Sequence, residues 1–276
     1  MLSSTHYRTV ITANLVMTRR QIDRKKKWEL VERKFKNFDK LITNWLVPLF
    51  RDEEKRYIRE VRSEFRKHVK SPDTVIEAIN RIEIEQRQTW TDESSVFFSE
   101  LLDEAGLFGL RRAGLSADLW DLLNSEVLRY LDEKVFNFAG GITNTTASQL
   151  RDTLREAITE GESINEMVAR IRRVFDGTVR GDTPRTRMIA RTESTGIVNG
   201  GTRLSYQQNP DIIQQIEWLS SRDARVRPTH TAADGQRVGL NESFNIGGAL
   251  MRHPGDPQGP AREVINCRCT VLPVLE

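Results

Sequence analysis

Apolar residues recur at three- and four-residue steps over long stretches of this chain, which is the period of an amphipathic helix. One such stretch runs from about Gln21 to Phe50, and Pro48 is expected to kink or end it. A second run follows, and its far side is dense in Lys, Arg and Glu. The apolar positions of the two runs are Leu30, Val31, Phe35, Phe38, Ile42, Trp45 and Leu49, then Ile58, Val61, Phe65 and Val69.

Helix start and stop signals divide the rest of the helical sequence. Ser71-Pro72-Asp73 opens a helix with a cap, a proline and an acid, and Ser163 and Glu166 form a capping box. Thr183-Pro184 opens a further helix that extends to about residue 208. Gly140-Gly141 is the strongest break signal, and it predicts a domain boundary.

Two short strands are predicted in the last quarter of the chain, over residues 216–219 and 264–272. Between them, Asp234-Gly235 is a turn signal, and the PGDP run at 254–257 cannot continue a helix or a central strand. The connection is therefore expected to be a long ordered loop. The second strand alternates, and one of its faces would carry Ile265, Cys267, Cys269 and Val271.

Together these elements predict an α+β protein. The expected division is a flexible arm at residues 1–20, a helical N-terminal domain at 21–139 and a C-terminal domain at 142–276. The C-terminal domain would combine helices with a small antiparallel sheet and long ordered loops.

The composition adds a charge asymmetry to an ordinary globular sequence with 38% hydrophobic and 29% charged residues. Residues 1–70 hold 19 Lys and Arg against 9 Asp and Glu, a net charge of +10, whereas residues 71–170 hold 9 against 19, a net charge of −10. No apolar run approaches the roughly 20 residues of a membrane helix. We expect no membrane segment and no signal peptide, and two cysteines two residues apart argue against an extracellular disulfide scaffold.

Four segments of the C-terminal part, in this order, resemble the phage head morphogenesis family, also called the Mu F-like or minor head protein family. They read EAITEGESINEMVARI, MIARTESTGIVNGG, EWLSSRDARVRPTHTAADGQ and MRHPGDPQGPAREVINCRC. The resemblance covers about residues 145–273. The residues of these segments that we expect to shape the domain are Arg191, Glu193, Trp218, Asp223, Arg227, His230, Asp234, Gly235, Pro254, Asn266, Cys267 and Cys269.

The resemblance implies a non-enzymatic minor head protein of a tailed phage or prophage. Its partners would be the portal protein and other head proteins, and it would act in head morphogenesis or in DNA packaging and ejection. Its place would be the interior of the virion head near the portal, after assembly in the host cytoplasm. The alternative is an enzymatic domain, nuclease-like or toxin-like, that acts on nucleic acid or a host protein.

Metal binding remains an alternative for the two cysteines. With His230 and His253 they supply the ligand types of a tetrahedral zinc site. On a regular strand, however, the Cα atoms of Cys267 and Cys269 would lie about 6.5 Å apart, so one ion would require a local bend. A disulfide would be harder to form, because its Cβ atoms should lie about 4 Å apart. The favoured interpretation is that both thiols pack in the core, so the sequence predicts no cofactor.

His230 has two interpretations as well. It can belong to a loop that is fixed by charge-assisted pairs among Asp223, Arg227 and Asp234. Alternatively it can be a general base with Glu193 or Asp234 as its partner. The sequence offers no nucleophile or phosphate loop to complete such a site, so a packed loop is favoured and no catalytic residue is predicted. Arg191 or Glu193 would pair with the same loop, around Asp223 to His230.

The basic cluster of the first helix can contact either non-specific DNA or an acidic face of the portal. Contacts with phosphates would make the affinity for DNA fall steeply as the salt concentration rises. No recognition helix or aromatic platform accompanies the cluster, which argues against sequence-specific reading. We favour the portal as partner, because non-specific DNA contact would not localise a minor protein. The cluster comprises Arg19, Arg20, Arg24, Lys25, Lys26 and Lys27.

Overall fold

The computed structural model describes residues 4–67, 72–181 and 183–275, with side chains from residue 23 onward except those of residues 66, 67 and 72. These residues form seven α-helices and five short strands, which confirms an α+β fold. The helices are α1 (Ser4–Lys67), α2 (Pro72–Ala113), α3 (Ser125–Thr159), α4 (Ile164–Val179), α5 (Pro184–Gln207), α6 (Pro228–Ala232) and α7 (Ala261–Val264). The strands are β1 (Gln215–Leu219), β2 (Arg237–Gly239), β3 (Phe244–Ile246), β4 (Ala249–Met251) and β5 (Thr270–Val274), and a short 3-10 turn covers Ala117–Leu119.

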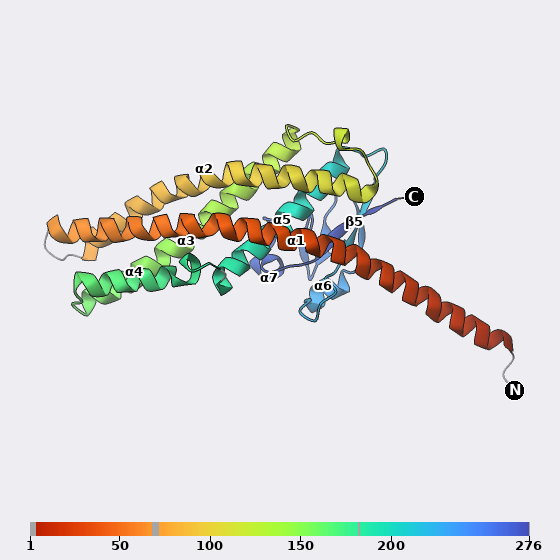
Figure 1. The fold of residues 1–276 in the computed structure, drawn as a ribbon, viewed down its shortest axis with the longest axis horizontal. Coiled ribbons are helices and arrows are strands. Elements are labelled where there is room, and N and C mark those ends of the chain that lie inside the picture. The colour runs from red at the N-terminus through yellow and green to blue at the C-terminus, as the bar shows by residue number, and fades with distance from the viewer. Residues whose placement is uncertain (1–3, 68–71, 182, 276) are drawn as a thin grey trace.

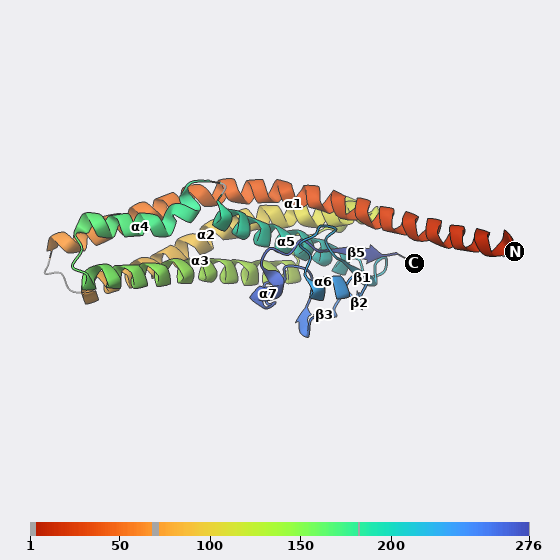
Figure 2. The same cartoon turned by 90° about the horizontal axis from the view of Figure 1, so that it is seen from below.

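The long helices lie side by side and form an elongated bundle, and the strands gather at one end of it (Figure 1). Helix α5 lies between α1 and α2 on one side and the strands on the other (Figure 2). The apolar periodicity predicted the bundle core correctly, since Phe35, Phe38 and Ile42 are fully buried. At the centre of the bundle an aromatic cluster joins three helices, with ring contacts among Trp45, Trp90, Phe98 and Phe138.

Helix α1 continues through Pro48 to Lys67, so of the two expected effects, a kink or an end, the end was wrong. Proline removes one backbone donor and disfavours the helix locally. Leu46 and Phe50 on either side of it are fully buried in the same core. Their packing outweighs the local penalty, because most helix stability in a protein comes from the buried face. The expected flexible arm at 1–20 falls on residues whose side chains lie outside the described ones, and the backbone from Ser4 onward is the start of α1.

The break expected at Gly140-Gly141 is also absent, because α3 is continuous from Ser125 to Thr159. Phe138 and Ala139 before the glycines and Ile142 after them are all buried. One hydrophobic core runs from Val31 on α1 to Leu204 on α5 and so includes residues from both sides of the predicted boundary. The segments 21–139 and 142–276 therefore share a helix and a core.

We expect the fragment 142–276 to fail to fold as a cooperative unit. Cutting before Ile142 divides α3 and removes α1 and α2, against which α5 packs most extensively. A thermal melt followed by circular dichroism should show a broad, non-cooperative change for the fragment and a sharp transition for the whole chain. A sharp transition in the fragment would restore the boundary predicted from the sequence.

Three strands form one antiparallel sheet in the order β2-β1-β5, and β3 and β4 form a separate hairpin. The strand expected at 216–219 is confirmed as β1, whose Trp218 faces Val271 across the ladder. The expected turn at Asp234-Gly235 is confirmed by the positive φ of 87° at Gly235. Among the described helices, none combines the length and the apolar character that a bilayer span requires.

The prediction of a strand over residues 264–272 was wrong for the first part of that range. Helix α7 ends at Val264, residues 265–269 are irregular, and β5 begins at Thr270. Asn266 adopts φ 59°, a left-handed conformation that asparagine tolerates and that no regular strand contains. The chain therefore bends just before the cysteines, which changes where their side chains lie.

Candidate functional site

Helix α5 fixes the backbone of the segment that carries the two cysteines. The Thr195 hydroxyl donates to the Cys267 carbonyl at 2.6 Å, and the Asn199 amide donates to the Cys269 carbonyl at 3.1 Å. The amide oxygen of Asn199 in turn accepts from the Val271 N–H at 3.2 Å. These buried bonds satisfy backbone groups that no strand partner reaches. Thr195 and Asn199 of the TESTGIVNGG run thus hold the loop that precedes β5.

The glycines of the same run permit close packing of α5. A Cβ atom on Gly200 would come within 2.3 Å of the Tyr130 ring on α3. A Cβ atom on Gly196 would lie 2.7 Å from the Gly255 carbonyl of the PGDP loop. Only glycine leaves room for these approaches. The run therefore brings α3 and the C-terminal loop together on one face of α5, since residues four apart share a helix face.

Arg268, between the two cysteines, ties the loop to α1. Its guanidinium forms an ion pair with Asp39, donates to Ser194 at 2.9 Å and lies 5.2 Å from the centre of the Phe35 ring. The side chain is buried, so this charge requires all of these partners. Sequence analysis did not single out Arg268, Thr195 or Asn199, because their partners lie far away in the chain. Their presence in the quoted motifs was the one available signal.

His230, Cys267 and Cys269 converge in the interior. The imidazole Nδ1 lies 3.3 Å from the Cys269 sulfur and 3.6 Å from the Cys267 sulfur. Both thiols are free and all three side chains are buried. On the other side of the ring, Nε2 lies 3.0 Å from a carboxylate oxygen of Glu263. Trp218 packs edge-on against the imidazole, with ring centres 5.5 Å apart.

The two thiols differ in acidity. Burial opposes ionisation of Cys267, but its hydrogen bonds with Cys269 and His230 prevail and hold the pKa of this thiol well below its usual value. Burial and the adjacent Cys267 raise the pKa of Cys269 well above the usual value. Cys267 is therefore the more readily ionised of the two thiols.

A pocket of about 440 Å³ opens beside this cluster. Arg191, Asp223 and Arg227 line it together with His230 and the cysteines. Asp223 accepts from the Arg225 N–H at 3.0 Å, which shapes the loop locally, and Arg227 donates to the Ile265 carbonyl. Arg191 thus lies on the wall of the pocket beside this loop. Glu193 instead pairs with Lys134 of α3 at 2.6 Å, so it is not a partner for His230.

Asp234 also does not contact the His230 ring through any bond in the described part of the chain. Its carboxylate accepts from the Ser220 N–H at 2.8 Å and from Arg222 at 2.9 Å, and it pairs with Arg24 at 2.9 Å. Burial alone would raise its pKa, but these donors and cations prevail and lower it. Asp234 is therefore a charged anchor for α1, and neither expected carboxylate supports a general-base role for His230.

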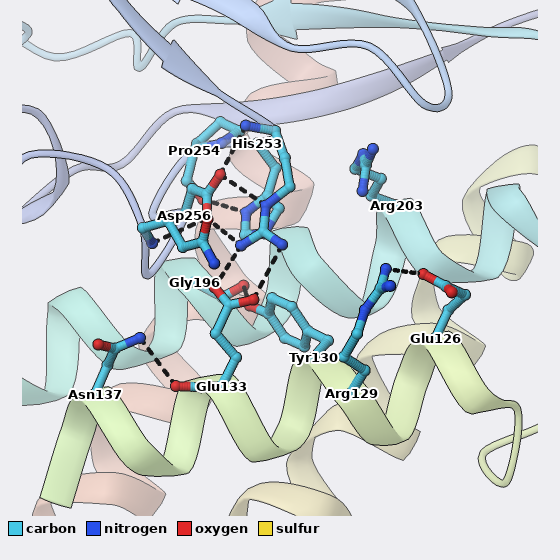
Figure 3. A network of polar contacts seen from close by, with 12 residues as sticks. Glu126, Arg129, Tyr130, Glu133, Asn137, Gly196, Arg203, His253, Pro254 and Asp256 are labelled. Carbon is cyan, nitrogen blue, oxygen red and sulfur yellow. Dashed lines mark hydrogen bonds and ion pairs between the residues drawn. The ribbon is translucent and has the colours of Figure 1, made fainter.

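His253 lies apart from the cysteines, which removes it from the suggested zinc ligands. Figure 3 shows it beside Tyr130, in a network between α3 and the PGDP loop. Arg252 bridges Glu133 of α3 at 2.6 Å and Asp256 of the loop at 2.5 Å. Pro254 contributes its carbonyl, 3.0 Å from the His253 Nδ1. Burial lowers the pKa of His253 to about 4, so the ring is neutral at pH 7.

The basic cluster is only partly available for an external partner. Arg24 forms ion pairs with Glu217 and Asp234, so it binds α1 to the C-terminal strands. Trp28, one turn later, is buried and donates to the Arg268 carbonyl at 3.0 Å. Lys25, Lys26 and Lys27 are exposed. The side chains of Arg19 and Arg20 lie outside the described residues.

The lysines of this cluster make only weak internal contacts. Lys25 pairs with Glu29 at 3.9 Å and Lys27 with Asp23 at 2.9 Å, each four residues away on the exposed helix. Exposed pairs of this kind contribute about 0.3–0.5 kcal/mol. The ammonium groups can therefore exchange their partners for phosphates or carboxylates of another molecule.

The structure thus describes an α+β scaffold in which motif residues of α5 hold the loop before β5, and comparison with known proteins gives the family of this part of the chain. Residues 148–272 match the family described as Phage Mu protein F like protein, so this part of the chain is a Mu F-like domain. The family indicates a phage head morphogenesis protein.

Two curated relatives are similar to about half of this chain. The uncharacterized protein YqbB of Bacillus subtilis (strain 168) is 26% identical over 159 residues, which are 56% of this chain and 50% of that protein. The NAD(+)--arginine ADP-ribosyltransferase EFV of Enterococcus faecalis (strain ATCC 700802 / V583) is 28% identical over 156 residues, 56% of this chain and 28% of that protein. This chain thus spans half or less of either relative. No solved structure gives a significant match.

Proposed function

We propose that this protein is a non-enzymatic minor head protein of a tailed phage or prophage. It resides inside the head near the portal vertex, assembles there from the host cytoplasm, and acts in head morphogenesis or in DNA packaging and ejection. Its partners are the portal and other head proteins.

One observation supports this proposal: polar residues of the motif segments within the Mu F-like match are used to build a scaffold. Thr195 and Asn199 hold the loop backbone, Glu193 pairs with Lys134, and Asp234 pairs with Arg24. A domain whose distinctive polar groups satisfy each other is suited to present a fixed surface to a partner. The long helix α1 extends beyond the rest of the molecule in Figure 1, and its exposed residues Lys25, Lys26 and Lys27 add positive charge next to that scaffold.

The second candidate function is an enzymatic one, and a specific finding favours it: one relative is named as an ADP-ribosyltransferase. The similarity covers 28% of that protein, so most of its length lies outside the match. We propose that the shared segment is the head-associated module. Transfer of ADP-ribose from NAD to an arginine substrate by this chain would support the enzymatic alternative instead.

Changing Lys25, Lys26 and Lys27 to glutamine is expected to prevent entry of the protein into heads. The change removes three exposed cations, and the ion pairs lost with Lys25 and Lys27 are weak surface pairs along the same helix. Incorporation is measured by mass spectrometry of purified heads, relative to the major capsid protein. Binding of the purified protein to random duplex DNA is expected to be negligible if the partner is the portal.

A matched control removes the same charge elsewhere on α1, with Lys36, Lys40 and Lys55 changed to glutamine, all of which are exposed. This variant should enter heads normally. Normal entry of the first variant would rule out the portal contact. The DNA alternative predicts that the affinity of the wild-type protein for DNA falls steeply with salt concentration. If the first variant reduces the slope of log affinity against log salt by up to about three units, DNA is the partner of the cluster.

A further inference from the structure

The bend at Asn266 brings together three side chains that a regular strand would keep apart. The Nδ1 of His230 and the sulfurs of Cys267 and Cys269 all lie within 4.8 Å of one another. They come from two separate segments, α6 and the irregular stretch before β5. Both segments are fixed independently, one by Ser220 donating to the His230 carbonyl and the other by Thr195 and Asn199 of α5. The convergence is therefore built by the fold.

The spacing of these atoms suits a zinc ion. Zinc binds histidine nitrogen at about 2.0–2.1 Å and thiolate sulfur at about 2.3 Å in tetrahedral geometry, which places nitrogen and sulfur about 3.6 Å apart. The two nitrogen–sulfur distances in this protein are 3.3 and 3.6 Å. A small outward movement of one sulfur would complete the geometry.

Glu263 prepares the histidine for this role. Its carboxylate lies 3.0 Å from Nε2 and also accepts from the Thr229 hydroxyl at 2.9 Å. A carboxylate at this place favours the tautomer that donates from Nε2, which leaves the lone pair of Nδ1 directed at the sulfurs. Histidine ligands of zinc characteristically donate their other ring N–H to a carboxylate or carbonyl.

The groups around the two sulfurs would stabilise them as thiolate ligands, because they include an N–H donor and positively charged side chains. The Cys269 N–H lies 3.4 Å from the Cys267 sulfur and can donate to it. Arg268 and Arg191 line the adjacent pocket. Zinc with two thiolates and the Glu263 carboxylate carries a net charge of −1, which the neighbouring guanidinium groups offset. The pocket also supplies a route by which the ion enters.

We propose that His230, Cys267 and Cys269 bind one zinc ion and that a water molecule from the pocket takes the fourth position. This proposal replaces the interpretation favoured by the sequence, in which the thiols only pack in the core. The ion links α6 to the segment before β5 and so holds the two ends of the long loop together. It is independent of the proposed function in the phage head.

The test begins with the metal content of the full-length protein, expressed with zinc and purified with a reductant. Elemental analysis should find about one zinc per chain, falling to about a tenth or less in Cys267→Ala and Cys269→Ala. His253→Gln is the matched control, because it alters a buried histidine outside the cluster, and it should keep the zinc. Glu263→Gln should weaken zinc binding about 10- to 100-fold while leaving the three ligands in place.

A cysteine variant that fails to fold would also lack zinc, so a second measurement uses the wild-type chain. Replacement of zinc by Co²⁺ should produce visible d–d bands and a near-ultraviolet sulfur-to-cobalt charge-transfer band, and added zinc should abolish both. The proposal is overturned if the wild-type protein holds no zinc and gives no such cobalt spectrum. Zinc retained in both alanine variants, or a disulfide between the two cysteines in the reduced preparation, would overturn it as well.

Discussion

Replacing Lys134 by methionine is expected to destabilise the protein by about 3–5 kcal/mol, because it leaves a carboxylate buried without its partner. Lys134 pairs with Glu193 at 2.6 Å, and their side chains are only 5% and 13% exposed. If one partner is removed, bulk water cannot solvate the charge that remains, because both side chains are buried. The free energy of unfolding should fall in urea titrations, with an unchanged slope if the folded state keeps its structure.

The double variant Lys134→Met with Glu193→Leu should recover most of that loss, since apolar residues of similar volume often replace a buried ion pair at little cost. A control at an exposed pair, Lys55→Met beside Asp52, should change stability by no more than about 0.5 kcal/mol. If Lys134→Met costs less than about 1 kcal/mol, the pair is hydrated in solution and the packing of α3 on α5 differs from that described.

Replacing Glu53 by glutamine should stabilise the protein at pH 8 and have little effect at pH 4.5. Burial raises the pKa of Glu53 to about 7, against opposing contributions from Trp90 and Arg185. The folded carboxyl therefore keeps its proton up to pH about 7, while the unfolded chain loses it above about 4.5. Between these values the folded state binds more protons, so the free energy of unfolding falls as pH rises.

The expected gain at pH 8 is up to about 3 kcal/mol, from a pKa difference of about 2.5 at 1.36 kcal/mol per unit. Glutamine keeps an oxygen that can accept from Trp90 Nε1, which now lies 3.2 Å from the carboxylate. The midpoint of urea unfolding is measured at both pH values. Asp52→Asn, at an exposed neighbour, should show no such difference. If Glu53→Gln changed the free energy of unfolding equally at pH 8 and pH 4.5, the carboxyl of Glu53 would ionise normally in the folded protein.

Hydrophobic periodicity predicted the helical bundle because long helices repeat the same signal many times. The proline and glycine signals at Pro48 and Gly140-Gly141 were poorer guides, because neither ends a helix where the flanking residues are buried in one core. The energy that keeps both helices continuous comes from contacts between distant segments. A single sequence does not display such contacts.

The candidate site also depends on contacts between distant segments, which a single sequence does not display. The sequence offered four metal-ligand types, and the structure brings His230, Cys267 and Cys269 together while His253 lies elsewhere in the fold. Strand geometry argued against a shared ion because it assumed extended backbone through Asn266. The left-handed conformation there depends on α7 before it and on the contacts of α5 beyond it. Arg268 and Lys134 were missed because their partners, Asp39 and Glu193, are fixed only by the packing of the helices.

The central claim is that this chain is a head protein placed at the portal, and quantitative mass spectrometry of purified, chemically cross-linked heads tests it most directly. We predict that the protein is present in a few copies per head and that lysines 25–27 cross-link to the portal protein. Heads that lack the protein, or that contain it without any portal cross-link, would contradict the account.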